Sequence, residues 1–117
     1  MKFTESLRKN QQFQFVYKNG KSYANKYMVM YVKKNGLEIN RLGISVSKKV
    51  GNSVVRHRIK RIIRESFRTS CDCWEDGCDI VIIARKEAKE KDYHQIESAL
   101  RHLGKHHNIY RDKGEKI

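Results

Sequence analysis

Residues 41–68, RLGISVSKKVGNSVVRHRIKRIIRESFR, decide the fold that this chain can adopt. Residues 41–47 alternate apolar side chains with small or polar ones, which predicts a strand that turns one face toward a core. A Gly-Asn pair then interrupts the strand, and Ser53 is a suitable cap for a helix over residues 54–68. On a helical wheel of that segment, one apolar arc is formed by Val55, Ile59, Ile62, Ile63, Ser66 and Phe67. The stretch therefore predicts a strand followed by a helix that packs on a sheet.

The segments on either side of this stretch predict two more strands. Residues 27–32 are all apolar or aromatic, and the Asn35-Gly36 pair that follows is typical of a tight hairpin turn. We therefore expect residues 27–32 and 41–47 to pair as antiparallel neighbours. Residues 80–84 form a continuous apolar run, which is typical of a strand buried on both faces. Their distance from the preceding helix suits a parallel crossover.

Capping signals predict a helix near each end of the chain. Asn10 is placed to cap a short helix that ends at Gly20. Asp92, with Gln95 three residues later, forms a variant of the capping box and begins a last helix that ends at Gly104.

The sequence predicts one domain over residues 1–117, because neither a repeat nor a linker divides the chain. The tail from about residue 105 lacks an apolar stripe and is expected to be mobile. No apolar run is long enough to span a bilayer, so we expect no membrane partner.

Positive charge is concentrated in the first part of the chain. Residues 1–64 contain 16 lysine and arginine side chains against only Glu5 and Glu38, whereas residues 65–117 are nearly neutral. Such an excess repels itself unless a polyanion binds to it, which favours nucleic acid as the partner. A merely solubilising surface and an anionic membrane surface are the alternatives.

The helix over residues 54–68 is the strongest candidate for that contact. Four basic residues spaced by four form a ridge beside its apolar arc, with Arg58 on the opposite flank: Arg56, Lys60, Arg64 and Arg68. Guanidinium groups suit bidentate phosphate contacts. A helix face that is only solvated normally places glutamate four residues before lysine, and such pairs are absent here.

Aromatic residues predict a second binding surface. A possible groove is formed by two rings of the first helix, one face of the strand over 27–32 and small residues of the neighbouring strand: Phe13, Tyr17, Tyr27, Val29, Tyr31, Ser45 and Ser47. Single-stranded bases stack on such rings. The alternative is that these rings belong to the core.

The thiols and histidines give little support for catalysis. Cys71, Cys73 and Cys78 are odd in number and no signal segment opens the chain, so we expect free thiols and a cytoplasmic protein. Zinc is the alternative, although a fourth ligand is not evident. His57 has no nucleophile or second acid-base residue specified near it, and the other histidines show no ligand pattern.

Residues 43–64, GISVSKKVGNSVVRHRIKRIIR, closely resemble the signature of the bacterial ribonuclease P protein subunit. The resemblance extends to the helical segment FQFVYKNGKSYAN at 13–25, the strand around Tyr31, the segment DIVIIAR at 79–85 and the closing helix. Where that family has arginine-asparagine-arginine, this chain has histidine in the middle position, His57.

The resemblance implies an α+β fold, an α-β-β-β-α-β-α two-layer sandwich with a four-stranded mixed sheet and a left-handed β-α-β crossover. It also implies a non-catalytic protein subunit of the ribonuclease P holoenzyme, a hydrolase that removes the 5′ leader of precursor tRNA. In that family the catalytic RNA, with magnesium, performs the cleavage. The implied partners are that RNA subunit and precursor tRNA, with a monomeric protein that holds no cofactor of its own.

Carried over by position, the resemblance divides the site residues into two groups, neither of them catalytic or metal-binding. The residues expected to contact the RNA subunit are Arg56, His57, Arg58, Lys60, Arg61, Arg64 and Arg68. The residues expected to contact the leader are Phe13, Tyr17, Val29, Tyr31, Ser45, Lys48 and Lys49. The alternatives are a ribosomal or other nucleic-acid-binding protein, such as a reader of duplex DNA, and a nuclease that uses His57.

Overall fold

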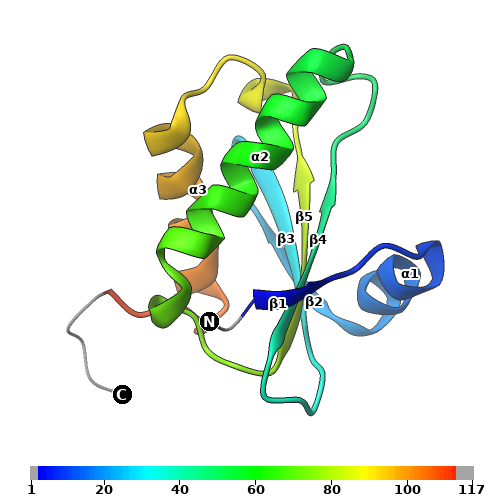
Figure 1. Ribbon diagram of the computed structural model, residues 1–117, viewed down its shortest axis with the longest axis vertical. Helices are drawn as coiled ribbons and strands as arrows, with labels where there is room; N and C mark the ends of the chain where they lie inside the picture. The colour runs from blue at the N-terminus through cyan, green and yellow to red at the C-terminus, as the bar shows by residue number, and fades with distance from the viewer. Residues whose placement is uncertain (1–2, 113–117) are drawn as a thin grey trace.

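The computed structural model describes residues 3–112, with side chains from Ser6 onward, and places helices on both faces of one sheet (Figure 1). The elements are β1 (Phe3–Ser6), α1 (Asn10–Asn19), β2 (Lys21–Ala24), β3 (Met28–Lys34), β4 (Asn40–Ser45), α2 (Ser53–Thr69), η1 (Cys71–Cys73), β5 (Cys78–Ala84), η2 (Lys86–Ala88) and α3 (Tyr93–His106). Helices α2 and α3 pack on one face of the sheet, and α1 packs on the other. The predicted α-β-β-β-α-β-α order is confirmed, with β1 added before it.

The five strands lie in the order β1-β4-β5-β3-β2. Strand β5 is therefore central, antiparallel to β3 and parallel to β4. The predicted antiparallel pairing of residues 27–32 with 41–47 is wrong, because β5 lies between β3 and β4. The turn itself is present, with Gly36 at φ +74°, but it joins two strands that flank the most apolar strand of the chain. Burial of β5 on both faces determines the strand order.

The crossover from β4 to β5 is left-handed. In Figure 1 the chain rises along β4, comes toward the viewer, descends through α2 and enters β5 on the left of β4. The connection is parallel, as the sequence predicts. Strand β1 adds a parallel edge strand beside β4, and β2 forms the other edge of the sheet beside β3. The segment 13–25 is therefore helical only as far as Asn19, and its remainder is β2.

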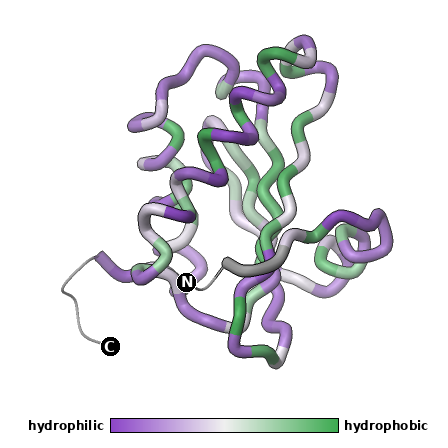
Figure 2. Tube along the Cα trace, viewed as in Figure 1, coloured by the Kyte–Doolittle hydropathy of each residue, from purple (hydrophilic) through white to green (hydrophobic). Residues whose placement is uncertain are grey.

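The larger core lies between the sheet and helices α2 and α3. Figure 2 shows hydrophobic residues along the central strands, with hydrophilic and hydrophobic residues alternating along α2. The predicted arc of α2 is confirmed: Ile59, Ile63 and Phe67 are fully buried, and the Ser66 hydroxyl is buried while donating to the carbonyl of Ile62. Strand residues Met30 and Ile82 are fully buried in the same cluster.

The helix ends agree with the capping signals to within one residue, except at the end of α3. Asn52, rather than Ser53, caps α2 through its side-chain oxygen, which accepts from Val55 N at 3.0 Å. Lys9, rather than Asn10, is the N-cap residue of α1. The capping box of Asp92 and Gln95 at the start of α3 is confirmed.

The C-terminal part of α3 and the segment after it differ from the prediction. Gly104 does not end the helix: it lies inside it, where a Cβ atom would come within 2.6 Å of the Trp74 ring. Ile109 and Tyr110 are buried, and the Tyr110 ring contacts Trp74 with centroids 5.0 Å apart. The segment predicted to be mobile therefore packs on the core at Ile109 and Tyr110, and its last residues, 113–117, lie outside the described residues.

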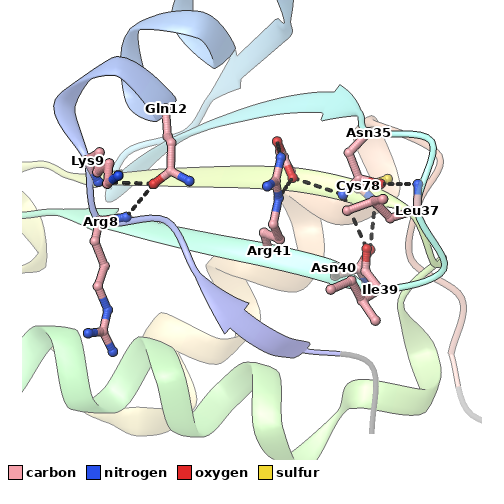
Figure 3. Close-up of polar contacts among 10 residues, drawn as sticks. Arg8, Lys9, Gln12, Asn35, Leu37, Ile39, Asn40, Arg41 and Cys78 are labelled. Carbon is pink, nitrogen blue, oxygen red and sulfur yellow. Dashed lines mark hydrogen bonds and ion pairs between the residues drawn. The ribbon is translucent and has the colours of Figure 1, made fainter.

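A polar cluster fixes the end of the sheet at which β5 begins (Figure 3). The Arg41 guanidinium donates to both carboxylate oxygens of Asp79, at 2.8 and 2.7 Å, and Asn35 Nδ2 donates to the same carboxylate at 2.9 Å. Asn40 Oδ1 accepts from Cys78 N at 2.8 Å. These bonds tie β4 and the turn after β3 to the central strand, and they give Arg41 a structural role.

Candidate nucleic-acid interface

Helix α1 covers only part of its face of the sheet. Across the strands, Gly43, Val81 and Tyr31 form one row, and Ser45, Ile83 and Val29 form the next. The first row lies under α1, and a Cβ atom on Gly43 would come within 2.8 Å of the Phe13 ring. The second row is only half-buried on all three strands. Of this row, Ser45 lines a pocket beside the helix.

Three aromatic rings line this face. The centroids of Phe13 and Tyr17 are 6.3 Å apart, and those of Tyr17 and Tyr31 are 4.9 Å apart, both in edge-to-face arrangements. All three are half-buried and pack on a small cluster around Val16 and Val81. The rings therefore contribute to a small core and also keep exposed surface. Burial raises the pKa of the Tyr17 hydroxyl, with a smaller contribution from Tyr31, so it stays neutral.

A groove runs from two of these rings, Phe13 and Tyr17, to the basic helix. One pocket of about 440 Å³ contains Phe13, Tyr17 and Ser45 in its lining, and a second of about 460 Å³ reaches Arg64 of α2. The two share four lining residues, Arg8, Phe13, Ile44 and Lys60. Among the side chains that the structure describes, no carboxylate lines either pocket. The groove therefore combines flat apolar surface with positive charge.

The basic ridge of α2 is not uniform. Lys60 and Arg64 line the groove, whereas Arg56 donates to the Gly51 carbonyl at 3.1 Å. Arg68 forms a bidentate pair with Glu65, at 2.9 and 2.5 Å, and this pair lowers the pKa of Glu65. Glu65 and Arg68 are three residues apart, so the absence of glutamate–lysine pairs spaced by four does not exclude this pair. The ridge therefore offers Lys60 and Arg64 to the groove, beside Arg8 from the segment before α1.

Comparisons with known proteins agree with this architecture. The family model described as Ribonuclease P matches residues 1–108. The chain is 66% identical over 106 residues to the ribonuclease P protein component of Lachnoclostridium phytofermentans, covering 91% of each chain. It is 41% identical to the solved RNase P protein of Staphylococcus aureus, with a TM-score of 0.85 over 92% of this chain and 99% of that one. For the RNase P protein of Thermotoga maritima, the identity is 37% and the TM-score 0.81, over 87% and 96% of the chains.

The chain belongs to the ribonuclease P protein family. It is a protein component of ribonuclease P, a tRNA-processing endonuclease, and membership in the family implies an RNA subunit as its partner. None of the helices in the described part of the chain is both long and apolar enough to cross a membrane.

Other residues predicted for the ribonuclease P interface lie outside the groove. Arg58 is on the opposite flank of α2 and donates to the carbonyls of Lys89 and Lys91, at 3.3 and 2.5 Å, so it fastens the segment before α3. His57 and Arg61 are exposed on α2. Lys48 and Lys49 are exposed in the turn that follows β4.

The sequence does not predict several residues of the groove and of the sheet face beside it. Arg8, Asn10 and Gln14 line the groove, but the position of Arg8 depends on β1, whose pairing has no local signal. Gln12 fixes the backbone between β1 and α1, because its side-chain oxygen accepts from the backbone N–H groups of Arg8 and Lys9, both at 3.0 Å (Figure 3). Ile83 is the one half-buried residue of β5, and an unbroken apolar run does not indicate which member will be exposed.

The thiols and histidines lie elsewhere. Cys71, Cys73 and Cys78 are free thiols, and burial raises the pKa of Cys78. His107 is half-buried, with Nε2 2.9 Å from the Met30 carbonyl oxygen, and it therefore has a structural contact that the sequence does not predict. Within residues 3–112 no three histidine, cysteine or acidic side chains are grouped so as to hold a metal ion.

Proposed function

We propose that this protein binds the single-stranded 5′ leader of precursor tRNA in the groove beside α1, and the catalytic RNA subunit through the cationic side of α2. In this account the protein, folded as a single domain and monomeric within the complex, works in the cytoplasm with the RNA subunit. The proposed leader residues are Phe13, Tyr17 and Ser45 in the groove, Val29, Tyr31 and Ile83 on the adjoining strands, and Lys48 and Lys49 in the turn after β4.

The observation that carries the proposal is the continuity of the groove. Phe13 and Lys60 line both of its pockets, so a strand whose bases stack on the rings also places phosphates near α2. Base stacking and phosphate neutralisation are the two interactions by which proteins hold single-stranded RNA. A half-buried ring suits this use better than a buried one, because part of its face stays accessible.

The same residues argue that the protein does not cut the RNA. Magnesium prefers oxygen ligands, above all carboxylates, and the side chains described along the groove present cations instead. We therefore assign the magnesium ions of the reaction to the RNA subunit. The protein contributes position and charge neutralisation for the strand that is cut.

Reconstitution tests the proposal. The protein alone should leave precursor tRNA intact, and the protein with its RNA subunit and magnesium should release the leader at the mature 5′ end. His57→Ala should retain this activity, because the sequence indicates no catalytic partner for its imidazole. Cleavage by the RNA-free protein, lost in His57→Ala, would identify a protein nuclease and refute the proposal.

A further inference from the structure

The outer face of α1 carries an exposed aromatic ring that the groove does not use. Phe15 is 56% exposed, whereas Phe13 and Tyr17, on the other side of the same helix, are half-buried. Of the large apolar side chains that the structure describes, only Leu37 and Val54 are comparably exposed, and both lie on other elements.

Amide side chains and one lysine surround the Phe15 ring. The ring lies in a shallow pocket of about 500 Å³ whose other lining residues are Asn10, Gln11, Gln14, Lys18 and Asn19. These supply amide donors and acceptors and one cation. Helix α1 contains no acidic residue. An anionic ligand with a flat ring and hydrogen-bonding edges matches this set of groups.

The pocket is continuous with the proposed leader groove. Asn10 and Gln14 line both, so they form the rim where α1 separates the two surfaces. A strand that leaves the groove over this rim reaches the Phe15 ring without crossing another element.

We propose that Phe15 is a further nucleotide subsite, which stacks an unpaired base of the same RNA strand that occupies the groove. The side chains of Gln11 and Gln14 contact the edges of that base, and Lys18 neutralises the adjoining phosphate. This inference rests on the proposed function, since it extends the path of the leader over the rim. A protein partner is less suited to the pocket, because amides ring the phenyl group where a protein interface would place further apolar surface.

The test uses precursor tRNA with 2-aminopurine, whose fluorescence falls when it stacks, at successive leader positions. In the complex with the RNA subunit, one position beyond those quenched by the groove should be quenched by Phe15. Phe15→Ala should restore fluorescence at that position and weaken binding about fivefold, the lower end of the range for one base on one ring. Phe15→Trp should keep the quenching. Leu37→Ala, which removes a comparably exposed apolar side chain on the turn after β3, is the control and should change nothing.

The outcomes separate the two proposals. If Tyr31→Ala restores fluorescence at a groove position and Phe15→Ala restores none, the subsite is refuted and the proposed function stands. If neither variant changes any position, the proposed function fails as well. If Phe15→Ala instead converts a dimer to a monomer in sedimentation with RNA binding unchanged, the outer face is a protein interface and the subsite is refuted.

Discussion

The two faces of the sheet are built differently. The face under α2 and α3 is closed by fully buried residues such as Met30, Ile82 and Phe67. The face under α1 buries few side chains and leaves a row of half-buried residues beside three rings. The same strands supply both, because alternate residues of β5 point to opposite sides. If the proposed function holds, stability and recognition are divided between the two sides of one sheet.

The largest effect should come from the closed face. Phe67→Ala should lower the free energy of unfolding by about 3–5 kcal/mol, because it leaves a cavity among residues that cannot collapse into it. Tyr31→Ala should cost clearly less, since its ring is only half-buried. Urea denaturation measures both. Equal losses would show that the α1 face is as much a core as the other.

Charge removal at the groove should leave stability unchanged and weaken RNA binding. Lys60→Ala combined with Arg64→Ala should reduce the slope of log affinity against log salt by about 0.7 for each phosphate that is no longer neutralised. Affinity titrations in a salt series measure this slope. Lys21→Ala with Lys26→Ala removes the same charge from exposed positions at the opposite edge of the sheet. If that control weakens binding as much, the charge acts without a defined groove.

Local patterns predict most of the fold but not the strand order. The arc of α2 and the capping box at Asp92 depend on neighbours within a few residues, and both are confirmed. The predicted pairing of the strands on either side of Asn35 and Gly36 is wrong, because the distant strand β5 takes the position between them. The short edge strands have the same explanation, since β1 exists only through its pairing with β4.

In the candidate site, too, local patterns predict some features, and others depend on distant segments. Phe13, Tyr17 and Tyr31 follow helical and strand periodicity, so the sequence places them on one surface. Their partial exposure follows from the length and position of α1, which covers the Gly43 row and stops short of the Ser45 row. No pattern within a segment contains that information.

The smallest effect concerns acid stability on the closed side. Burial lowers the pKa of His107, whose ring contacts Tyr23, and the nearby charges of His106 and Lys21 lower it further. As pH falls through the unfolded-state pKa of about 6.5, the unfolded chain binds the proton more readily, so stability decreases toward pH 5. His107→Gln should lose less melting temperature than the wild type between neutral and mildly acidic pH. Equal losses would assign the acid sensitivity to other groups.

The division of the two faces is tested most directly by one pair of affinities, those of the reconstituted complex for leader-bearing precursor tRNA and for mature tRNA. Tyr31→Ala should weaken precursor binding about five- to tenfold, the lower part of the range for one stacked base, and leave mature tRNA binding unchanged. Tyr31→Phe should behave like the wild type, because it keeps the ring. An equal loss for both ligands, or no loss for either, would contradict the assignment of the half-open face to the leader.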